Sequence, residues 1–393
     1  MKTRKSAKDI MLPHSAAKVE FYEKYLEKYL AIMAVTGWCK QVNLFDVFCG
    51  RGEYDDGGWG SPIRAVKVLM KIQSEYNSNT EFHLYLNDLN VNHIDNVKIC
   101  LKKYFPNYEE FVKIHYSHND AEKMLAQLCR MLSSTPSNTR NLLFIDPYGY
   151  KYIHKDIIES LMSNRKTEIL LFLPVSFMHR FTHVAFDEKK AKGTAPLKKF
   201  ISDFFPENHP VRNEEPMDIS KYIKELTKAF SFGNTIYAAN FEIQRDEKNY
   251  FALFFLTSNL LGFEKIVKVK WELDAEYGRG FRLDNNESMF PGFVQEFNKQ
   301  TEEECVEHMK VELLSLLRRK ACDNGVLYRF TLRCGYLPKI AKAALKQLLN
   351  EKKIKVSPIS KNEIKKGAFY LNYKDQASPR ISISINEELN ENN

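Results

Sequence analysis

The chain has few cysteines and none of the arrangements in which cysteine usually holds a protein together. Its seven cysteines include no Cys-x-x-Cys pair, so the sequence contains neither a disulfide framework nor a zinc signature. No apolar run reaches the roughly 18–20 residues that a membrane span needs. The basic N-terminal residues are followed by no hydrophobic signal segment. These absences predict a cytoplasmic protein with reduced thiols and no membrane partner.

Length and charge set wider limits. The 393 residues are enough for two or three domains with a real hydrophobic core. The formal net charge of +8 permits a nucleic-acid partner without requiring one. The places where basic residues gather therefore matter more than their number.

The stretch 41–62 is the feature around which the rest of the chain is organised. It begins as an apolar, β-forming run, breaks into glycines and ends in a Ser-Pro pair that is typical of a helix start. A strand, a glycine-rich turn and a helix start present backbone N–H groups to a nucleotide. Asp46 lies where the strand ends, and Gly50 and Gly52 let a ligand approach the main chain. These three residues are candidate cofactor ligands; the alternative is a tight turn that needs glycine for its geometry alone.

Two further acids follow predicted strands and are candidates for the same site. Asp88 ends the run 82–88, where the acid of a nucleotide-binding α/β domain takes the ribose hydroxyls. Asp120 follows the run 111–116 and is expected either to bind an adenine amino group or only to cap the next helix.

The segment Asp146-Pro147-Tyr148-Gly149 follows a fourth apolar strand. It resembles the Asp-Pro-Pro-Tyr motif of methyltransferases that act on the exocyclic amino groups of bases, with Tyr148 in place of the second proline. In that motif the acid polarises the amine and the aromatic ring stacks on the base. Asp146, Pro147 and Tyr148 are therefore candidate catalytic residues; the alternative is a turn that only ends the strand.

A long amphipathic helix is predicted over residues 12–37, before the glycine-rich stretch. His14 and Lys18 lie four residues apart near its start, so they are expected to point together toward whatever the helix end covers. Both are candidate catalytic residues. The alternative is a solvated first turn.

The remainder of the α/β domain contains an interruption and a hairpin. A charged, lysine-rich stretch around residues 182–230 predicts a polar insertion, either a lid or a solvated helical excursion. Two β-forming runs at 236–243 and 250–257 then predict an antiparallel hairpin. A Rossmann-like sheet closed by such a hairpin is the class I methyltransferase arrangement and favours S-adenosylmethionine over NAD. We expect residues 1–40 to form a helix that caps the sheet edge and residues 41–290 to form the catalytic domain.

Residues 300–373 carry the pattern of a winged helix. Helices are predicted at 302–320 and 338–351, followed by two short strands around a lysine-rich loop, at 355–356 and 368–371. Such a concentration of lysine suits phosphate contacts, although winged helices also dock proteins. The residues after 374 are polar and predicted to be disordered. The candidate nucleic-acid-binding residues are Lys339, Lys342, Lys346, Lys353 and Lys365, together with Arg180 after the fifth strand.

Taken together, these motifs resemble the bacterial three-Cys-motif partner family. The resemblance covers roughly residues 12–275 and rests on His14-x3-Lys18, Phe45-Asp46-x-Phe48-x-Gly50-x-Gly52, Gly60-Ser61-Pro62, Ile145-Asp146-Pro147-Tyr148-Gly149 and Arg180. It implies a partner that is a radical S-adenosylmethionine-type protein with three iron–sulfur-ligating cysteines, similar to spore photoproduct lyase. This chain has no such cysteine cluster, so it is not that partner.

The favoured function is a methyltransferase-like enzyme that acts on nucleic acid. In this interpretation Gly50, Gly52, Asp88 and Asp120 hold S-adenosylmethionine, and the Asp146 segment presents a nucleophilic nitrogen. Methyl transfer needs mainly alignment and a desolvated acceptor, so it requires few ionisable groups.

Two other functions remain open. In the first, Asp46, Asp88 and Asp146 bind Mg²⁺ or Mn²⁺, which prefer carboxylates, and His14 or Lys18 acts on a phosphodiester. The chain is then a nuclease that works in DNA repair or defence with the same partner. In the second, the chain is a non-catalytic winged-helix adaptor with a degenerate Rossmann domain.

Overall fold

A computed structural model describes residues 10–147, 149–187, 193–213, 217–232, 235–246, 249–274, 280–281, 301–359, 365 and 367–386. The chain divides into two compact units. The first holds residues 1–259 and 280–283, and the second holds residues 260–279 and 284–393. No helix within the described ranges is long and apolar enough to cross a membrane.

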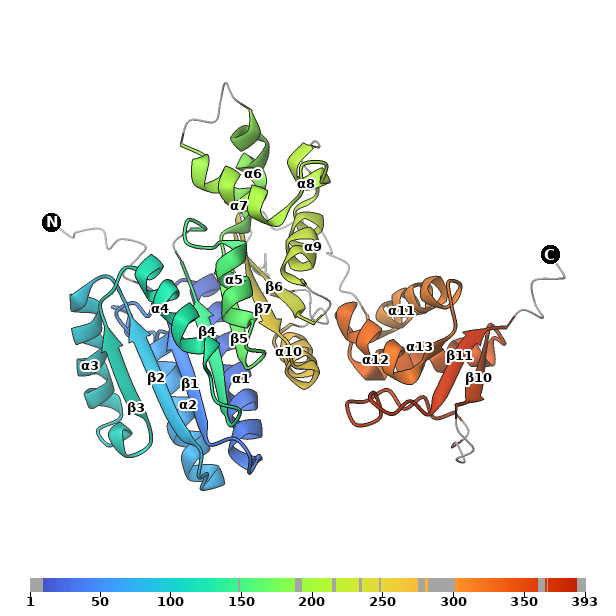
Figure 1. The fold of residues 1–393 in the computed structure, drawn as a ribbon, viewed down its shortest axis with the longest axis horizontal. Helices are drawn as coiled ribbons and strands as arrows, with labels where there is room; N and C mark the ends of the chain where they lie inside the picture. Colours follow the sequence, from blue (N-terminus) through green and yellow to red (C-terminus); the bar gives the residue numbers. More distant parts are fainter. Residues whose placement is uncertain are drawn as a thin grey trace, which may run out of the picture. The chain divides into compact units, whose positions relative to one another are not determined.

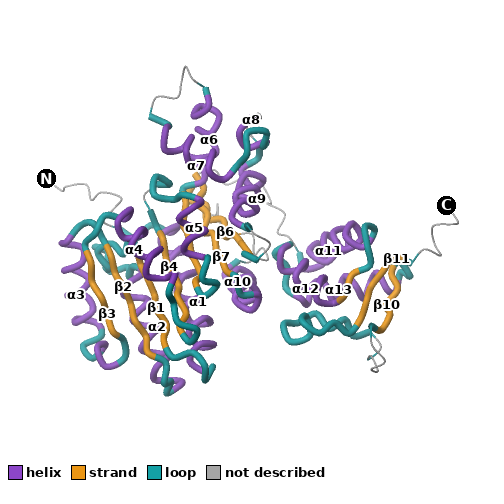
Figure 2. The backbone as a smooth tube through the Cα atoms, in the orientation of Figure 1, coloured by secondary structure: helices purple, strands orange, loops and turns teal. Residues whose placement is uncertain are grey.

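The first unit is built on an eight-stranded sheet with the order β3-β2-β1-β4-β5-β7-β6-β8 (Figure 2). Its strands are β1 (Gln41–Asp46), β2 (Glu81–Asn87), β3 (Lys113–Ser117), β4 (Thr139–Ile145), β5 (Thr167–Leu173), β6 (Tyr237–Asp246), β7 (Asn249–Thr257) and β8 (Gly280–Phe281). Strands β1 to β5 are parallel, whereas β7 runs antiparallel to both β5 and β6. This order, with its antiparallel β6–β7 hairpin, confirms the predicted class I methyltransferase-like sheet. The carboxyl ends of the parallel strands meet at one edge, where open α/β sheets bind ligands.

Helices cover both faces of this sheet (Figure 1). They are α1 (Pro13–Val35), α2 (Ser61–Tyr76), α3 (Val91–Tyr104), α4 (Ala121–Ser133), α5 (Lys155–Met162), α6 (Val175–Phe186), α7 (Ala195–Phe204), α8 (Pro210–Asn213) and α9 (Ile219–Phe230), with a short 3-10 turn at Tyr108–Glu110. Helices α1, α2 and α3 are neighbours in one layer, and α4, α5, α7 and α9 are neighbours in the other.

Helix α1 lies across a face of the sheet, so the prediction that it caps the sheet edge is wrong. Its Tyr22 stacks on Phe144 of β4 with ring centroids 4.6 Å apart, and its Tyr25 meets Phe255 of β7 at 4.8 Å. A helix with this broad aromatic stripe needs a whole sheet face to bury it. That position carries the start of α1 to the carboxyl edge of the strands.

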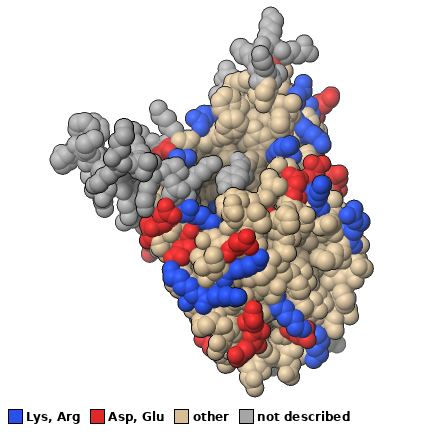
Figure 3. Space-filling model, turned by 90° about the vertical axis from the view of Figure 1, so that its left-hand side faces the viewer, with Lys and Arg blue, Asp and Glu red and all other residues tan. Residues whose placement is uncertain are grey.

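Basic side chains do not form a continuous patch on the face shown in Figure 3. Lys and Arg side chains are interspersed there with Asp and Glu (Figure 3). At the β3 end of the sheet, Lys113 pairs with Glu81 at 2.8 Å, and Lys103 pairs with Glu53 at 3.4 Å. A basic surface for nucleic acid must therefore be sought on other elements.

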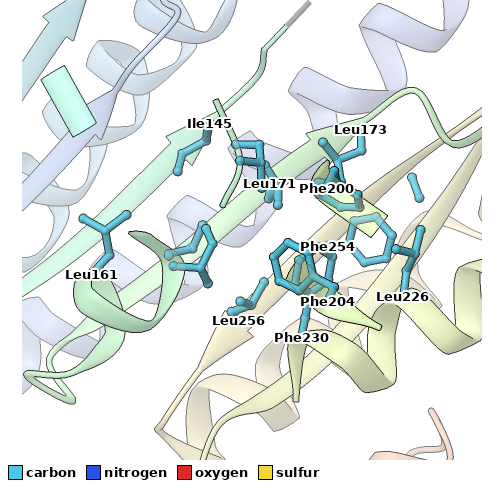
Figure 4. Packing of buried hydrophobic residues seen from close by; sticks show 14 of the residues in the cluster. Ile145, Leu161, Leu171, Leu173, Phe200, Phe204, Leu226, Phe230, Phe254 and Leu256 are labelled. Carbon is cyan, nitrogen blue, oxygen red and sulfur yellow. The ribbon is translucent and has the colours of Figure 1, made fainter. Parts of the chain in front are cut away.

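The stretch 182–230 is helical and amphipathic where the structure describes it. Phe200 of α7 and Phe230 of α9 belong to the same apolar cluster as Leu171 of β5 and Phe254 of β7 (Figure 4). The prediction of a polar lid is therefore wrong for α7 and α9. Besides its lysines, the stretch contains apolar residues at helical spacing, and these residues pack against the sheet.

The second unit contains α10 (Leu260–Leu273), α11 (Glu302–Leu317), β9 (Cys322–Asp323), α12 (Asn324–Arg333), α13 (Pro338–Asn350), β10 (Ile354–Pro358) and β11 (Ile381–Ile385). Its small sheet has the order β10-β11-β9, which together with α11 to α13 confirms the predicted winged helix. The final strand, β11, lies in the tail predicted to be disordered, whereas residues 368–371 form no strand. Both segments alternate buried and half-buried residues, but Tyr370 has a positive φ of 50°, which an extended strand does not allow, whereas Ile381 and Ile383 continue the ladder fully buried.

Helix α10 was expected in the catalytic domain but belongs to the second unit. The Tyr328 hydroxyl of α12 donates a hydrogen bond to the Glu264 carboxylate of α10. The Trp271 indole of α10 donates to the carbonyl of Gly335 at 3.0 Å. Both contacts join residues 64 positions apart along the chain, so no local pattern in the sequence indicates them.

Glu168, near the start of β5, generates a prediction about stability and pH. Its buried carboxylate accepts hydrogen bonds from the hydroxyls of Tyr25 and Thr257, and burial raises its pKa from the usual 4.5 to about 7. The folded state therefore keeps a proton that the unfolded state has released. This stability is fully present below pH 4.5 and is lost as the pH rises to about 7, by about 1.4 kcal/mol per pKa unit.

We expect Glu168→Gln, which cannot ionise, to gain thermal stability relative to the wild type as the pH rises across this range. Glu20→Gln, at an exposed position on α1, is the matched control and should show a constant difference. A pH-independent difference for Glu168→Gln would contradict the assignment.

Candidate active site

Two carboxylates lie at the carboxyl edge on the neighbouring strands β1 and β4. Asp46 ends β1 and is only 1% exposed; its Oδ2 accepts a hydrogen bond from the Ser61 hydroxyl at 2.6 Å. Its Oδ1 is buried without a hydrogen-bond partner among the described residues. Burial raises the pKa of Asp46 to about 7; the Ser61 hydrogen bond opposes this shift and the charge of Asp146 adds to it. Oδ1 of Asp46 is therefore a buried acceptor atom at this edge whose hydrogen bonding no described side chain completes.

Helix α1 brings Lys18 to the second carboxylate, Asp146. The Lys18 ammonium donates to Oδ2 of Asp146 and lies 4.7 Å from the centre of the Phe172 ring. Their side chains are only 11% and 22% exposed. Burial alone would lower the pKa of Lys18, but Asp146 outweighs it and raises that pKa above its usual value. Lys18 is therefore a fixed cation, not a general base.

His14, one turn before Lys18, completes the cluster. Its ring stacks on Phe251 with centroids 5.1 Å apart and planes 7° apart, and Phe251 stacks in turn on Phe172. Burial, together with the positive charges of Arg245 and Lys18, lowers the pKa of His14 from its usual 6.5 to about 4. His14 is therefore neutral near pH 7 and available to accept a hydrogen bond. The structure thus brings His14 and Lys18 together, as their spacing predicted.

The glycine-rich turn lies beside these residues and has the backbone geometry that only glycine adopts readily. Gly50 and Gly52 have φ angles of 63° and 82°. A methyl group on Gly52 would lie 3.0 Å from Val97 of α3, whereas one on Gly50 would meet nothing within 4 Å. Gly52 therefore packs the turn against α3, and Gly50 faces open space.

Asp88 follows β2 at this edge, as predicted, and supports the turn. Its carboxylate accepts the Gly50 N–H at 3.0 Å and the Asn90 N–H at 2.9 Å, and it lies 3.1 Å from a His93 ring nitrogen. A carboxylate has about four acceptor positions, so capacity remains for a ribose hydroxyl.

Asp120 has the simpler of its two predicted roles. Its carboxylate accepts the N–H of Glu122 at 2.9 Å and caps α4. An adenine-binding role is not needed to explain its position. Pro147 is buried directly after Asp146, and Tyr148 lies outside the described residues.

The three acids do not form the metal site that the nuclease interpretation required. Among the residues that the structure describes, no three His, Cys, Asp or Glu side chains form a group that could hold a metal ion. Asp88 faces the glycine turn, and Asp146 faces the Lys18 ammonium. A shared sheet edge fixes where each strand ends but not where each carboxylate points, and the prediction failed for that reason.

Sequence reasoning missed the aromatic floor of the site. Phe172 of β5 and Phe251 of β7 support the Lys18 ammonium and the His14 ring. Their strands were predicted, but the antiparallel pairing that puts Leu173 opposite Ala252 was needed to bring the two rings together.

In the second unit, three of the predicted nucleic-acid-binding lysines share an exposed side of α13. Lys339, Lys342 and Lys346 are spaced along that helix, the second of a helix-turn-helix whose turn contains Gly335 at φ 81°. Lys339 pairs with Glu302 at 2.7 Å.

The remaining predicted lysines and Arg180 are placed differently. Lys353 pairs with Glu351 at 2.8 Å, and Lys365 is exposed. Arg180 belongs to the first unit, where α6 carries it. Its guanidinium donates to the Asn249 side chain at 2.8 Å.

The chain is similar to known proteins in two ways. Residues 285–360 match the model of the GMT-like wHTH domain, which is less than half of the chain. No curated protein sequence matches the chain. The three-Cys-motif partner resemblance therefore stays a prediction.

Solved structures show a distant likeness. A protein from Klebsiella pneumoniae assigned as an O-methyltransferase is 13% identical, with 63% of this chain and 90% of that chain covered and a TM-score of 0.32. The O-methyltransferase TomG from Streptomyces achromogenes, in complex with S-adenosylmethionine, is 10% identical, with 62% of this chain and 87% of that chain covered and a TM-score of 0.32. The METTL16 methyltransferase domain is 10% identical, with 59% of this chain and 66% of that chain covered and a TM-score of 0.27. These scores are too low to carry an argument, so the fold class rests on the strand order and direction.

The buried ion pair generates a prediction about stability. We expect Lys18→Met to destabilise the protein by about 3 kcal/mol, because it leaves a shielded carboxylate unpaired. The double variant Lys18→Met/Asp146→Asn should cost less than the sum of the single variants, with a coupling of roughly 1–3 kcal/mol in urea unfolding.

Lys24→Met, on the same helix, is the matched control. Lys24 pairs with Glu20 at an exposed position, so its loss should cost less than about 1 kcal/mol. Additive effects of Lys18→Met and Asp146→Asn would show that the pair is not coupled.

Proposed function

We propose that the first unit is an S-adenosylmethionine-dependent methyltransferase and that its substrate is nucleic acid, which the winged-helix unit helps to bind. One observation carries this proposal. The open turn at Gly50, the acid Asp88 and the cluster of Asp46, Asp146 and Lys18 lie at the same carboxyl edge of a methyltransferase-like sheet. Open α/β sheets bind their ligands and place their chemistry at that edge.

The residues present fit S-adenosylmethionine. Gly50 has open space beside its backbone, Asp88 keeps an acceptor position, and Oδ1 of Asp46 is a buried acceptor without a partner among the described residues. These groups would hold the hydroxyls and the positively charged parts of the cofactor. When bound, the cofactor supplies an electrophilic methyl group.

The chain's own residues prepare the acceptor. Lys18 binds Oδ2 of Asp146, so Oδ1 is the atom left to accept a hydrogen bond from an acceptor amine. Neutral His14 accepts a second hydrogen bond, and the stacked rings of Phe172 and Phe251 exclude water from one side. Alignment of this kind is the main requirement of methyl transfer.

The partner protein enters this proposal on the sequence resemblance alone. A radical S-adenosylmethionine-type protein with three iron–sulfur-ligating cysteines should co-purify with this chain when the two are produced together. The nuclease interpretation has no such support, because its three acids do not converge among the described residues.

The glycine turn offers a matched pair of variants for cofactor binding. Gly50 and Gly57 both have positive φ, at 63° and 84°, and a methyl group on either meets nothing within 4 Å. Alanine should therefore cost both positions a similar strain, about 1 kcal/mol. Only Gly50→Ala should weaken S-adenosylmethionine binding in calorimetry, by about tenfold or more, because its methyl group would occupy the proposed cofactor space. Equal binding by both variants, or no binding by the wild type, would contradict the cofactor assignment.

The lysines of α13 predict a salt-dependent affinity for duplex DNA. Replacing Lys342 and Lys346 by alanine in the full chain should reduce the log–log salt slope by about 0.9 for each lost phosphate contact. Lys320→Ala removes a positive charge from an exposed position after α11 and should leave the slope nearly unchanged. An unchanged slope in the α13 variant would identify the winged helix as a protein-docking module.

A further inference from the structure

Helix α6 leaves two aromatic rings open to solvent directly after the carboxyl edge of β5. Phe177 is 45% exposed and Phe181 is 37% exposed, and their ring centroids are 4.6 Å apart. Tyr150, four residues after Asp146, stacks on Phe177 with a centroid distance of 6.2 Å and an interplanar angle of 28°. The three rings form an aromatic column that runs from the β4 loop along α6.

Phe177 and Phe181 do not belong to the hydrophobic core, whereas the half-buried Tyr150 packs against it. Helix α6 buries its other side, through Val175, Met178 and Ala185, which are fully buried. Phe177 and Phe181, four residues apart, therefore lie on the solvent-exposed side of the helix. Tyr150 is anchored from behind by Phe200 of α7 at 6.0 Å. Adjacent large rings in solvent are uncommon on a soluble protein unless they bind something.

Basic side chains accompany these rings. Helix α6 contains no Asp or Glu, and it carries Arg180 between the two phenylalanines. The Arg180 guanidinium is held by the Ser176 carbonyl at 3.2 Å and by Asn249 at 2.8 Å. Lys151, next to Tyr150 in the sequence, lies 5.1 Å from the centre of the Tyr152 ring. Arg180 and Lys151 are therefore two cations near these rings that suit phosphate groups.

We propose that Tyr150, Phe177 and Phe181 stack on unpaired bases of single-stranded nucleic acid while Arg180 and Lys151 contact its phosphates. Aromatic faces with neighbouring cations are the general means of binding single strands, because every base has a π-face and every nucleotide a phosphate. In a duplex those base faces are already covered. The inference deepens the proposed function by naming unpaired nucleotides as the substrate class, and it rests on that function only for the identity of the neighbouring site.

The test measures the binding of a fluorescently labelled oligothymidylate, and of its duplex with oligoadenylate, to the full chain by anisotropy. All proteins carry Lys342→Ala/Lys346→Ala, so that the α13 lysines contribute equally little. We expect the single strand to bind more tightly than the duplex. Phe177→Leu/Phe181→Leu, which keeps the apolar surface but removes the rings, should weaken single-strand binding by about tenfold or more. Phe177→Trp/Phe181→Trp should restore it.

Tyr76→Ala is the matched control. Tyr76 is 42% exposed at the end of α2, at the opposite edge of the β-sheet. Its loss should therefore leave the binding of the single-stranded oligonucleotide unchanged. If the leucine variant binds the single strand as tightly as its parent, or if Tyr76→Ala is equally weakened, the stacking proposal is overturned. In the first case the surface fits an apolar protein partner instead.

A parallel titration with S-adenosylmethionine separates the two proposals. A chain that binds the cofactor but shows no preference for single strands overturns this inference alone. If the chain binds the single strand in a way that depends on the Phe177 and Phe181 rings but does not bind the cofactor, this inference is supported and the proposal of a methyltransferase is overturned.

Discussion

The structure of the first unit depends on a buried ion pair between a helix that precedes the sheet and a loop that follows its fourth strand. Lys18 and Asp146 are 128 residues apart along the chain, yet their charged atoms meet at the carboxyl edge. Two charges that are largely shielded from water are tolerated only in good mutual geometry. The pair therefore constrains where α1 crosses the sheet, and the aromatic packing of Tyr22 and Tyr25 maintains that crossing.

The electrostatics of the site follow from this constraint. The negative charge of Asp146 raises the pKa of the Lys18 ammonium above its usual value, while burial shifts the pKa of Asp46 upward, to about 7, and that of His14 downward, to about 4. Three neighbouring ionisable groups are thereby held in different states near neutral pH. Clusters of perturbed groups in which neighbouring charges and burial differ from residue to residue are typical of functional sites.

The local parts of this site could be predicted from the sequence, and the parts that depend on long-range packing could not. A strand, a glycine turn and a helix start are contiguous, so Gly50 and Gly52 were recognised from their neighbours alone. Asp88 was placed correctly at its strand end, but its bond to the Gly50 N–H depends on how two loops fold toward each other. The same limit explains why a metal site was expected from three strand ends whose carboxylates in fact turn to different partners.

The second unit shows the same division between local and distant information. The amphipathic pattern of α13 was read correctly, whereas β11 was assigned to a disordered tail because its serines are polar. Its isoleucines are buried only when β10 and β9 lie on either side. Helix α10 joins this unit through the hydrogen bonds of Tyr328 and Trp271, and no local sequence pattern predicts these contacts.

The most direct measurement is the transfer of isotope from methyl-labelled S-adenosylmethionine to single-stranded nucleic acid by the full chain, with its predicted partner present and absent. We expect label to enter the nucleic acid, and we expect Asp146→Asn to abolish this transfer while calorimetry still detects cofactor binding. Undiminished transfer by Asp146→Asn would contradict the role given to the carboxyl-edge cluster. A wild-type chain that transfers no label under either condition would contradict the methyltransferase itself.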